Sequence, residues 1–408
     1  MDIVERSLFP EKFDREGGSG ILPWQQIRRM VDTGQISATP DVADSQVQPA
    51  SIDLRLGKQA YRVQASFLRG RSATLFTKVQ ELLDSTIDLT QPTPALLEPG
   101  VVYIIPLLEQ LRLPNDVQGI ANPKSTTGRL DVFTRLITEH GDQFDRVSKG
   151  YKGLLYVEVS SRTFPIRVKA GMTLNQLRFV RGNSLDPVRN GELRKLAKDE
   201  HLIYEPDGRP TSDRIGEGIE LTVDLEGDAP SSIVAYKAKD SPRAIELDKV
   251  SHYHPDDYWE AIPRPRRGHL ILTRGGFYLL ASKNRVSVPL DHAAEMVAHD
   301  PSMGEFRVHY AGFFDPGFGY GAKKGEISGT KAVLEVRAYE VPILLEDSDV
   351  VGRLHYYPMA AIPDKVYGVS IGSSYQQQGL ALSKQFKRPD IQQRSAPVTQ
   401  LSSTPVPA

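Results

Sequence analysis

The sequence predicts a mainly-β protein made of two related halves. Short apolar runs rich in Val, Ile, Leu and Tyr alternate with turn residues, among them 33 Gly and 29 Pro in 408 residues. Such runs bounded by Gly and Pro are typical of strands. Helical periodicity is confined to a few short segments. An internal repeat is the third observation, because residues 153–179 align without a gap with residues 330–356.

The elements can be predicted from local pattern in chain order. Pro23 lies in the first turn of a first helix, in which Trp24, Ile27 and Val31 share one face. A second helical pattern covers residues 190–202. The predicted strands lie in the apolar runs 51–57, 101–108, 153–161, 270–282, 332–338 and 341–345.

The repeat has a constant offset of 177 residues. At this offset Glu158 aligns with Glu335 within a strand, and Ser125 aligns with Ser302 further upstream. The match favours a duplication over the alternative of two unrelated β domains.

These patterns predict the domain organisation. At roughly 150 residues per domain, the length allows two or three domains. We expect two β domains, two ends without fixed structure and a polar connection that contains the second helix. The predicted segments are a loose N-terminus (1–20), a first domain (21–181), a linker with a helix (182–216), a second domain (217–360), a C-terminal segment (361–386) and a disordered tail (387–408).

Composition excludes several classes of protein. The net charge is −1, which argues against nucleic acid or an anionic membrane as a partner. The chain has no cysteine, so thiol nucleophiles, disulfides and Cys-ligated zinc are excluded, and with them the zinc nucleobase deaminases. The charged N-terminus is no secretory signal, and no apolar stretch is long enough to span a membrane. We therefore expect a soluble cytoplasmic protein.

A loop rich in hydroxyl groups and cations is the strongest candidate for a binding site. Lys124, Ser125, Thr126, Thr127 and Arg129 lie within six residues, together with a glycine. Hydroxyls, backbone N–H groups and fixed cations suit a polyphosphate. By itself the pattern also fits an ordinary turn.

Glu158 is the second candidate because it interrupts an apolar strand. Strand alternation places it on the face of Leu154 and Tyr156. It either points outward or is buried as a general acid or base with a raised pKa, and periodicity does not decide between the two.

Together these segments resemble the family of trimeric dUTPases and dCTP deaminases. The resemblance is carried in the family's order by 48–57 (QPASIDLRLG), 122–132 (NPKSTTGRLDV), 144–159 and 169–179, while 365–386 is similar to the deaminase tail. It implies two dUTPase-like distorted β-barrels of the β-clip type, with few short helices, the second being a diverged copy.

Within that family, deaminases carry Ser-x-x-x-Arg followed by a strand Glu, which Ser125, Arg129 and Glu158 match. The dUTPases carry an Asp shortly before Tyr-x-Gly. Here Tyr151 begins such a motif, but Asp145 lies six residues ahead of it and is off register. The resemblance therefore implies deamination of dCTP to dUTP and ammonia. The alternatives are a dUTPase, a bifunctional enzyme that forms dUMP, and a non-catalytic nucleotide-binding regulator.

The resemblance also implies roles for residues and partners. Glu158 would transfer protons to and from a water that attacks C4 of cytosine, while Ser125 positions the water and Arg129 shapes the charge. Mg²⁺ would accompany the triphosphate, zinc is not expected, and the chain would form a homotrimer. Segment 361–386 would close over the nucleotide. The implied substrate-binding residues are Lys124, Thr126, Thr127, Arg146, Gln176, Tyr375 and Gln378.

The second copy departs from the family pattern. Phe306 stands where the first copy has Arg129, and Arg353 replaces Gln176. We therefore expect a non-catalytic second half. The rival hypothesis is a composite site to which Asp315 or Glu335 contributes, since family sites form between neighbouring subunits.

Overall fold

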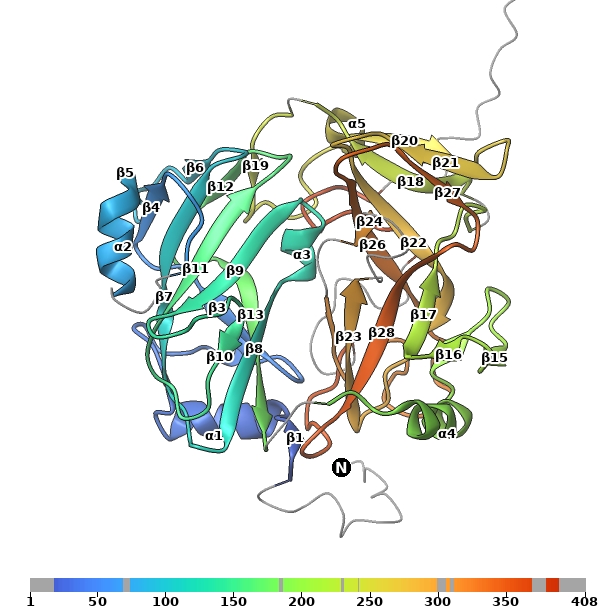
Figure 1. Cartoon of the computed structure of the whole chain (residues 1–408), viewed down its shortest axis with the longest axis horizontal. Helices are drawn as coiled ribbons and strands as arrows, with labels where there is room; N and C mark the ends of the chain where they lie inside the picture. Colours follow the sequence, from blue (N-terminus) through green and yellow to red (C-terminus); the bar gives the residue numbers. More distant parts are fainter. Residues whose placement is uncertain are drawn as a thin grey trace, which may run out of the picture.

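A computed structural model describes residues 18–68, 74–182, 186–228, 231–240, 242–298, 306–308, 312–368 and 379–388. The two halves of the chain stand side by side, with the first half blue to green and the second yellow to red (Figure 1). Within these ranges the helices are α1 (Trp24–Asp32), α2 (Leu75–Leu82), α3 (Ser125–Gly128), α4 (Asn190–Glu200) and α5 (Pro255–Tyr258). No helix in the described part of the chain has the length and apolar character needed to span a membrane.

The first half contains two main sheets. In the smaller one, β13 (Thr173–Arg181) pairs with β1 (Gly20–Ile21), β3 (Ile52–Arg55) and β8 (Val117–Pro123), which in turn pairs with β10 (Arg146–Val147). The larger has the order β5 (Leu83–Asp88), β4 (Gln59–Val63), β7 (Val102–Arg112), β11 (Lys152–Ser161) and β9 (Val132–Thr138), with β2 (Ile36–Ser37) on β7.

The second half repeats this arrangement. One sheet has the order β16 (Ile215–Gly216), β17 (Gly218–Thr222), β28 (Val350–Pro358), β23 (His292–Ala298) and β25 (Phe313–Phe314). In the other, β22 (Phe277–Val286) pairs with β14 (Ile203–Tyr204), β18 (Ile233–Ala238) and β26 (Thr330–Ala338). Beyond them lie β15 (Pro210–Thr211), β20 (Trp259–Pro263) and β24 (Phe306–Val308).

The pairing pattern is the same in both halves. β13 lies between β3 and β8 as β28 lies between β17 and β23, and β11 pairs with β7 as β26 pairs with β22. The predicted mainly-β fold with a duplicated domain is confirmed. β14 and β15, however, extend a second-half sheet, where the sequence predicts a linker.

Two small sheets complete the fold. The first contains β6 (Ala95–Leu97), β12 (Ile166–Val168) and β19 (Ile245–Glu246), so a second-half strand pairs with a first-half strand. The other pairs β21 (His269–Leu272) with β27 (Ile343–Glu346).

The core of the first half extends into the interface between the halves. Leu54, Val157 and Leu177 fill the space between its two main sheets, and Trp259 and Phe277 of the second half join the same cluster. A separate cluster fills the core of the second half. Because these second-half residues pack into the core of the first half, one side of the second half is held firmly against the first.

Candidate active site

The hydroxyl-rich loop forms α3, which lies on the side of the first half that faces the second (Figure 1). The backbone N–H groups of Thr127 and Gly128 both donate to the carbonyl oxygen of Lys124, at 2.8 and 3.0 Å, and close the turn. The predicted residues Lys124, Ser125, Thr126 and Thr127 therefore lie on one short turn at the end of β8.

Glu335 of the second half lies directly against this turn. A Cβ atom added to Gly128 would come within 2.4 Å of its Oε2 atom, so the carboxyl group fills the space that the glycine leaves. Glu335 is 5 % exposed. Burial raises its pKa well above the ordinary value, Arg129 opposes that rise and Asp131 adds to it. A buried carboxyl group whose pKa is raised thus lies beside an arginine.

Residues 379–388, from the C-terminal part of the chain, pack against α3. The Nη1 atom of Arg129 donates to the carbonyl oxygen of Ala381 at 3.0 Å. The hydroxyl group of Ser383 donates to the carbonyl oxygen of Thr126 at 2.8 Å. Arg129 is 4 % exposed, so the segment and Glu335 shield the guanidinium from solvent.

A cavity of about 230 Å³ opens beside α3. Its walls include the side chains of Lys124, Thr126, Thr127, Lys384 and Gln385. Burial lowers the pKa of Lys384, and repulsion from Lys124 lowers it further. Two cations and two hydroxyl groups suit an anionic ligand, although Asp248 also lines this cavity.

Asp53 binds Lys124, one of the two lysines that line this cavity. Its carboxylate forms an ion pair with Lys124, whose ammonium group also donates to the hydroxyl of Thr173 at 3.1 Å. Burial raises the pKa of Asp53, and Lys124 opposes that rise. Through this ion pair, Asp53 fixes the position of Lys124 beside the cavity.

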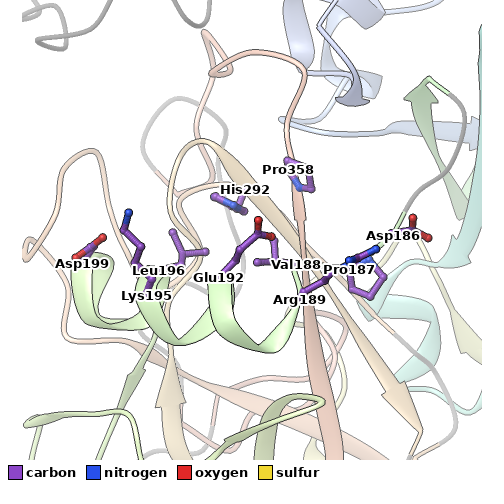
Figure 2. A pocket seen from close by; sticks show the side chains of 10 residues that line it. All are labelled: Asp186, Pro187, Val188, Arg189, Glu192, Lys195, Leu196, Asp199, His292 and Pro358. Carbon is purple, nitrogen blue, oxygen red and sulfur yellow. The ribbon is translucent and has the colours of Figure 1, made fainter.

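A larger cavity of about 480 Å³ lies at α4 (Figure 2). Figure 2 shows Glu192 and Lys195 on the helix and His292 across from them. Its charged lining residues have both signs, among them Arg189 and Asp199. It has none of the predicted site residues, whereas Lys124, Thr126 and Thr127 line the smaller cavity. The candidate active site is therefore this cavity together with Arg129 and Glu335, which lie against α3 outside the cavity lining.

Glu158 lies elsewhere in the first half. Its Oε1 atom accepts hydrogen bonds from Nε and Nη2 of Arg135 at 3.0 and 2.6 Å, and the guanidinium stacks 3.7 Å from the centre of the Phe144 ring. On this face of the sheet, Tyr156 packs with Val79 of α2. Figure 1 shows α2 and α3 on opposite sides of the first half. Within the chain, the structure therefore brings Glu335, and not Glu158, to Gly128 and Arg129 of the predicted motif.

Of the other predicted substrate-binding residues, one lies beside the cavity, one lies away from it and two are outside the described residues. Gln176 pairs with Asp53 in the sheet, and its Nε2 atom is 3.4 Å from the carbonyl oxygen of Pro123, so it borders the site. Arg146 is exposed on β10 and pairs with Ile120, on another part of the sheet. Tyr375 and Gln378 lie outside the described residues.

Asp315, the other rival candidate, is used for packing. It forms an ion pair of 3.2 Å with Arg178, which β13 inserts into the second half. Arg178 is 1 % exposed and stacks 4.0 Å from the centre of the Phe313 ring. The pair holds the two halves together rather than facing the cavity.

The sequence reasoning did not single out Lys384, Asp131 or Arg337. Lys384 lies within residues 365–386, whose resemblance to a tail that closes over the nucleotide could have indicated that it reaches the site. Asp131 forms an ion pair with Arg337 across the interface between the halves, and no local pattern in the sequence marks that pair.

Family models match nearly the whole described chain. The model of the 2′-deoxycytidine 5′-triphosphate deaminase N-terminal domain matches residues 18–183, and that of the C-terminal domain matches residues 189–386. The chain belongs to the dCTP deaminase family. The predicted resemblance to dCTP deaminases is confirmed, and the two domain models match the first and the second half of the chain.

Individual relatives agree with this membership. A crystal structure of 2′-deoxycytidine 5′-triphosphate deaminase from Agrobacterium tumefaciens is 44% identical, with a TM-score of 0.77 over 84% of this chain and 99% of that one. A dCTP deaminase from Natronomonas pharaonis is 30% identical over 161 residues, 39% of this chain and 79% of the relative. A dUMP-forming dCTP deaminase from Mycobacterium sp. (strain KMS) is 29% identical over 167 residues, 40% of this chain and 80% of the relative. The likeness to the Agrobacterium structure extends over both halves.

Proposed function

We propose that the chain deaminates dCTP to dUTP and ammonia in a site that α3 and β26 form together, with Glu335 as the general acid/base. Membership of the dCTP deaminase family supports the reaction. The single observation that carries the site is the Glu335 carboxyl group packed against Gly128, beside Arg129.

The mechanism follows from the state of this carboxyl group. Because burial raises its pKa, the protonated form of Glu335 is favoured, and this form would donate its proton to N3 of cytosine. Its carboxylate then takes a proton from the water that attacks C4 and passes it to the amino group, which leaves as ammonia when the C4–N bond breaks. The proton of the C4 hydroxyl returns to Glu335 as the C4 carbonyl forms, which restores the starting acid. Arg129 stabilises the transient carboxylate, and Ser125, the first residue of α3, positions the water.

The triphosphate would occupy the cavity between Lys124 and Lys384, with the hydroxyl groups of Thr126 and Thr127 as further donors. The cavity offers cations and hydroxyls, and the described residues contain no cluster of three His, Asp or Glu side chains that could hold a metal. This donor set suits Mg²⁺ that is bound by the phosphates themselves.

A second candidate function is the conversion of dCTP through to dUMP. The relatives that are named dUMP-forming favour it. It needs an additional group to activate water at the phosphate. Asp145 has a pKa raised to about 7 by burial, but its Oδ1 atom accepts a hydrogen bond of 2.7 Å from the backbone N–H of Leu136 on β9. Release of pyrophosphate separates the two functions.

Two isosteric substitutions test the assignment. Purified full-length protein is incubated with dCTP and Mg²⁺, and dUTP, dUMP, ammonia and pyrophosphate are resolved. We expect Glu335→Gln to lower kcat by about 10²–10⁴-fold while dCTP still binds, because proton transfer is lost. Glu158→Gln is the matched control, which we expect to keep turnover and to lower only Tm, since it weakens the contact with Arg135.

The reverse pattern, with Glu158→Gln inactive and Glu335→Gln active, would contradict the composite site and support the role predicted for Glu158. Pyrophosphate with dUMP would establish the bifunctional alternative. Saturable dCTP binding by the wild-type protein without any product would support a nucleotide-binding regulator.

A further inference from the structure

An ion pair between the two halves lies next to the proposed site. Asp131 is fully buried, and its carboxylate accepts from Nη2 of Arg337 and from the Thr163 hydroxyl at 2.6 Å. The same Nη2 lies 2.6 Å from that hydroxyl, and Nη1 of Arg337 donates to the carbonyl oxygen of Gly275 at 2.5 Å. Both charges are therefore held in fixed geometry.

Asp131 has a backbone conformation that its neighbours must enforce. Its φ is 55°, in the left-handed region that non-glycine residues seldom adopt and that Asp tolerates better than most. Its N–H donates to the carbonyl oxygen of Gly128 at 2.8 Å, and its own carbonyl oxygen accepts from the N–H of Arg162 at 3.0 Å. Such strain is kept where the position of a side chain matters.

The pair is placed to fix the proposed site. Arg337 follows Glu335 by two residues on β26, so both side chains leave the same face of the strand, about 7 Å apart. Asp131 follows Arg129 by two residues just beyond α3. When Asp131 holds Arg337, the strand can present Glu335 only opposite Gly128 and Arg129.

The repeat shows that only one pairing of the halves can make this contact. At the offset of 177 residues, Ser160 is the counterpart of Arg337 on β11, and Val308 is the counterpart of Asp131. The strand that carries Glu158 therefore has no cation at the position that would meet Asp131. A buried ion pair that specifies one partner over a similar one is a known use of such pairs.

We infer that Asp131 and Arg337 are positioning residues that select β26, and not the similar strand β11, as the strand that delivers the general acid/base to the Ser-x-x-x-Arg motif. This inference rests on the proposed function, because its readout is the deamination of dCTP. It concerns how the site is assembled and not which group transfers protons.

Kinetics of conservative variants test the inference. We expect Arg337→Lys and Asp131→Asn to lower kcat by about 10²-fold with little change in KM, since a displacement near 1 Å at a reacting group has effects of this size. The charged groups that face Glu335 are Arg129 and Asp131, with Arg337 on its own strand. Because the charge of Asp131 raises the pKa of Glu335, Asp131→Asn should also shift the limb of the pH–kcat profile that reports Glu335 to lower pH.

The matched control is Arg178→Lys, which alters the other buried ion pair between the halves, with Asp315. It should lower Tm and leave kcat and the pH profile at wild-type values. If Arg337→Lys and Asp131→Asn lower only Tm, as the control does, the pair is merely structural and the inference is wrong. A wild-type protein without deaminase activity would instead refute the proposed function, so the two failures are distinguishable.

Discussion

At the scale of single residues, Gly128 makes room for the proposed acid/base. Gly128→Ala would place a methyl group where Oε2 of Glu335 now lies. We expect kcat to fall by about 10²-fold because the carboxyl group is displaced. Gly191→Ala is the control, since nothing lies within 4 Å of its added Cβ atom. Steady-state kinetics of both variants check this, and equal activity of the two would show that the space beside Gly128 has no importance.

Also at this scale, the sequence was enough to predict the cluster of Lys124 to Arg129. It was not enough to predict which glutamate serves as the proposed general acid/base. Lys124 to Arg129 are adjacent in the chain, so their clustering could be predicted. Glu158 and Glu335 stand in strands of the same pattern, and alternation tells only which face each one shares with its neighbours. Which face meets α3 depends on packing between distant segments, so Glu335 could be named only as a rival candidate.

At the scale of elements, the segment 379–388 packs against the second half through one buried aromatic side chain. Phe386 is 3 % exposed and its ring lies 5.4 Å from that of Tyr258 and 6.0 Å from that of Trp259. Phe386→Ala should cost about 3–5 kcal/mol locally, enough to release the segment from α3. We expect a lower kcat/KM for dCTP and a small change in Tm. Lys387→Ala, at the exposed next position, should match wild type, and an unchanged kcat/KM in Phe386→Ala would contradict a role of the segment in the site.

The elements themselves were predictable where hydrophobic periodicity was long enough. The runs at 153–161 and 332–338 became β11 and β26. Helix α2 was missed because it has only eight residues and buries only Leu75 and Val79. Its one local signal is Thr74, whose side chain accepts from the N–H of Thr77 at 3.1 Å as an N-cap.

At the scale of the whole molecule, the repeat predicted two similar domains and could not predict how they pack. A mixing experiment tests that packing. Glu335→Gln and Ser125→Ala each disable one half of the proposed site. If both halves of a site come from one chain, a mixture of the two variants should be as inactive as either alone. Recovery of about a quarter of the wild-type activity would mean that the halves come from different chains, as in a trimer whose sites lie between subunits.

The packing of second-half residues into the core of the first half has a consequence for the enzyme in dilute solution. In an assembly of separate subunits, a site at an interface is lost when the protein concentration falls below the dissociation constant of the subunits, because the subunits separate. Here the peptide chain keeps α3 and β26 at a high effective concentration, whatever the number of molecules per volume. Specific activity measured over a wide range of enzyme dilutions should therefore be constant.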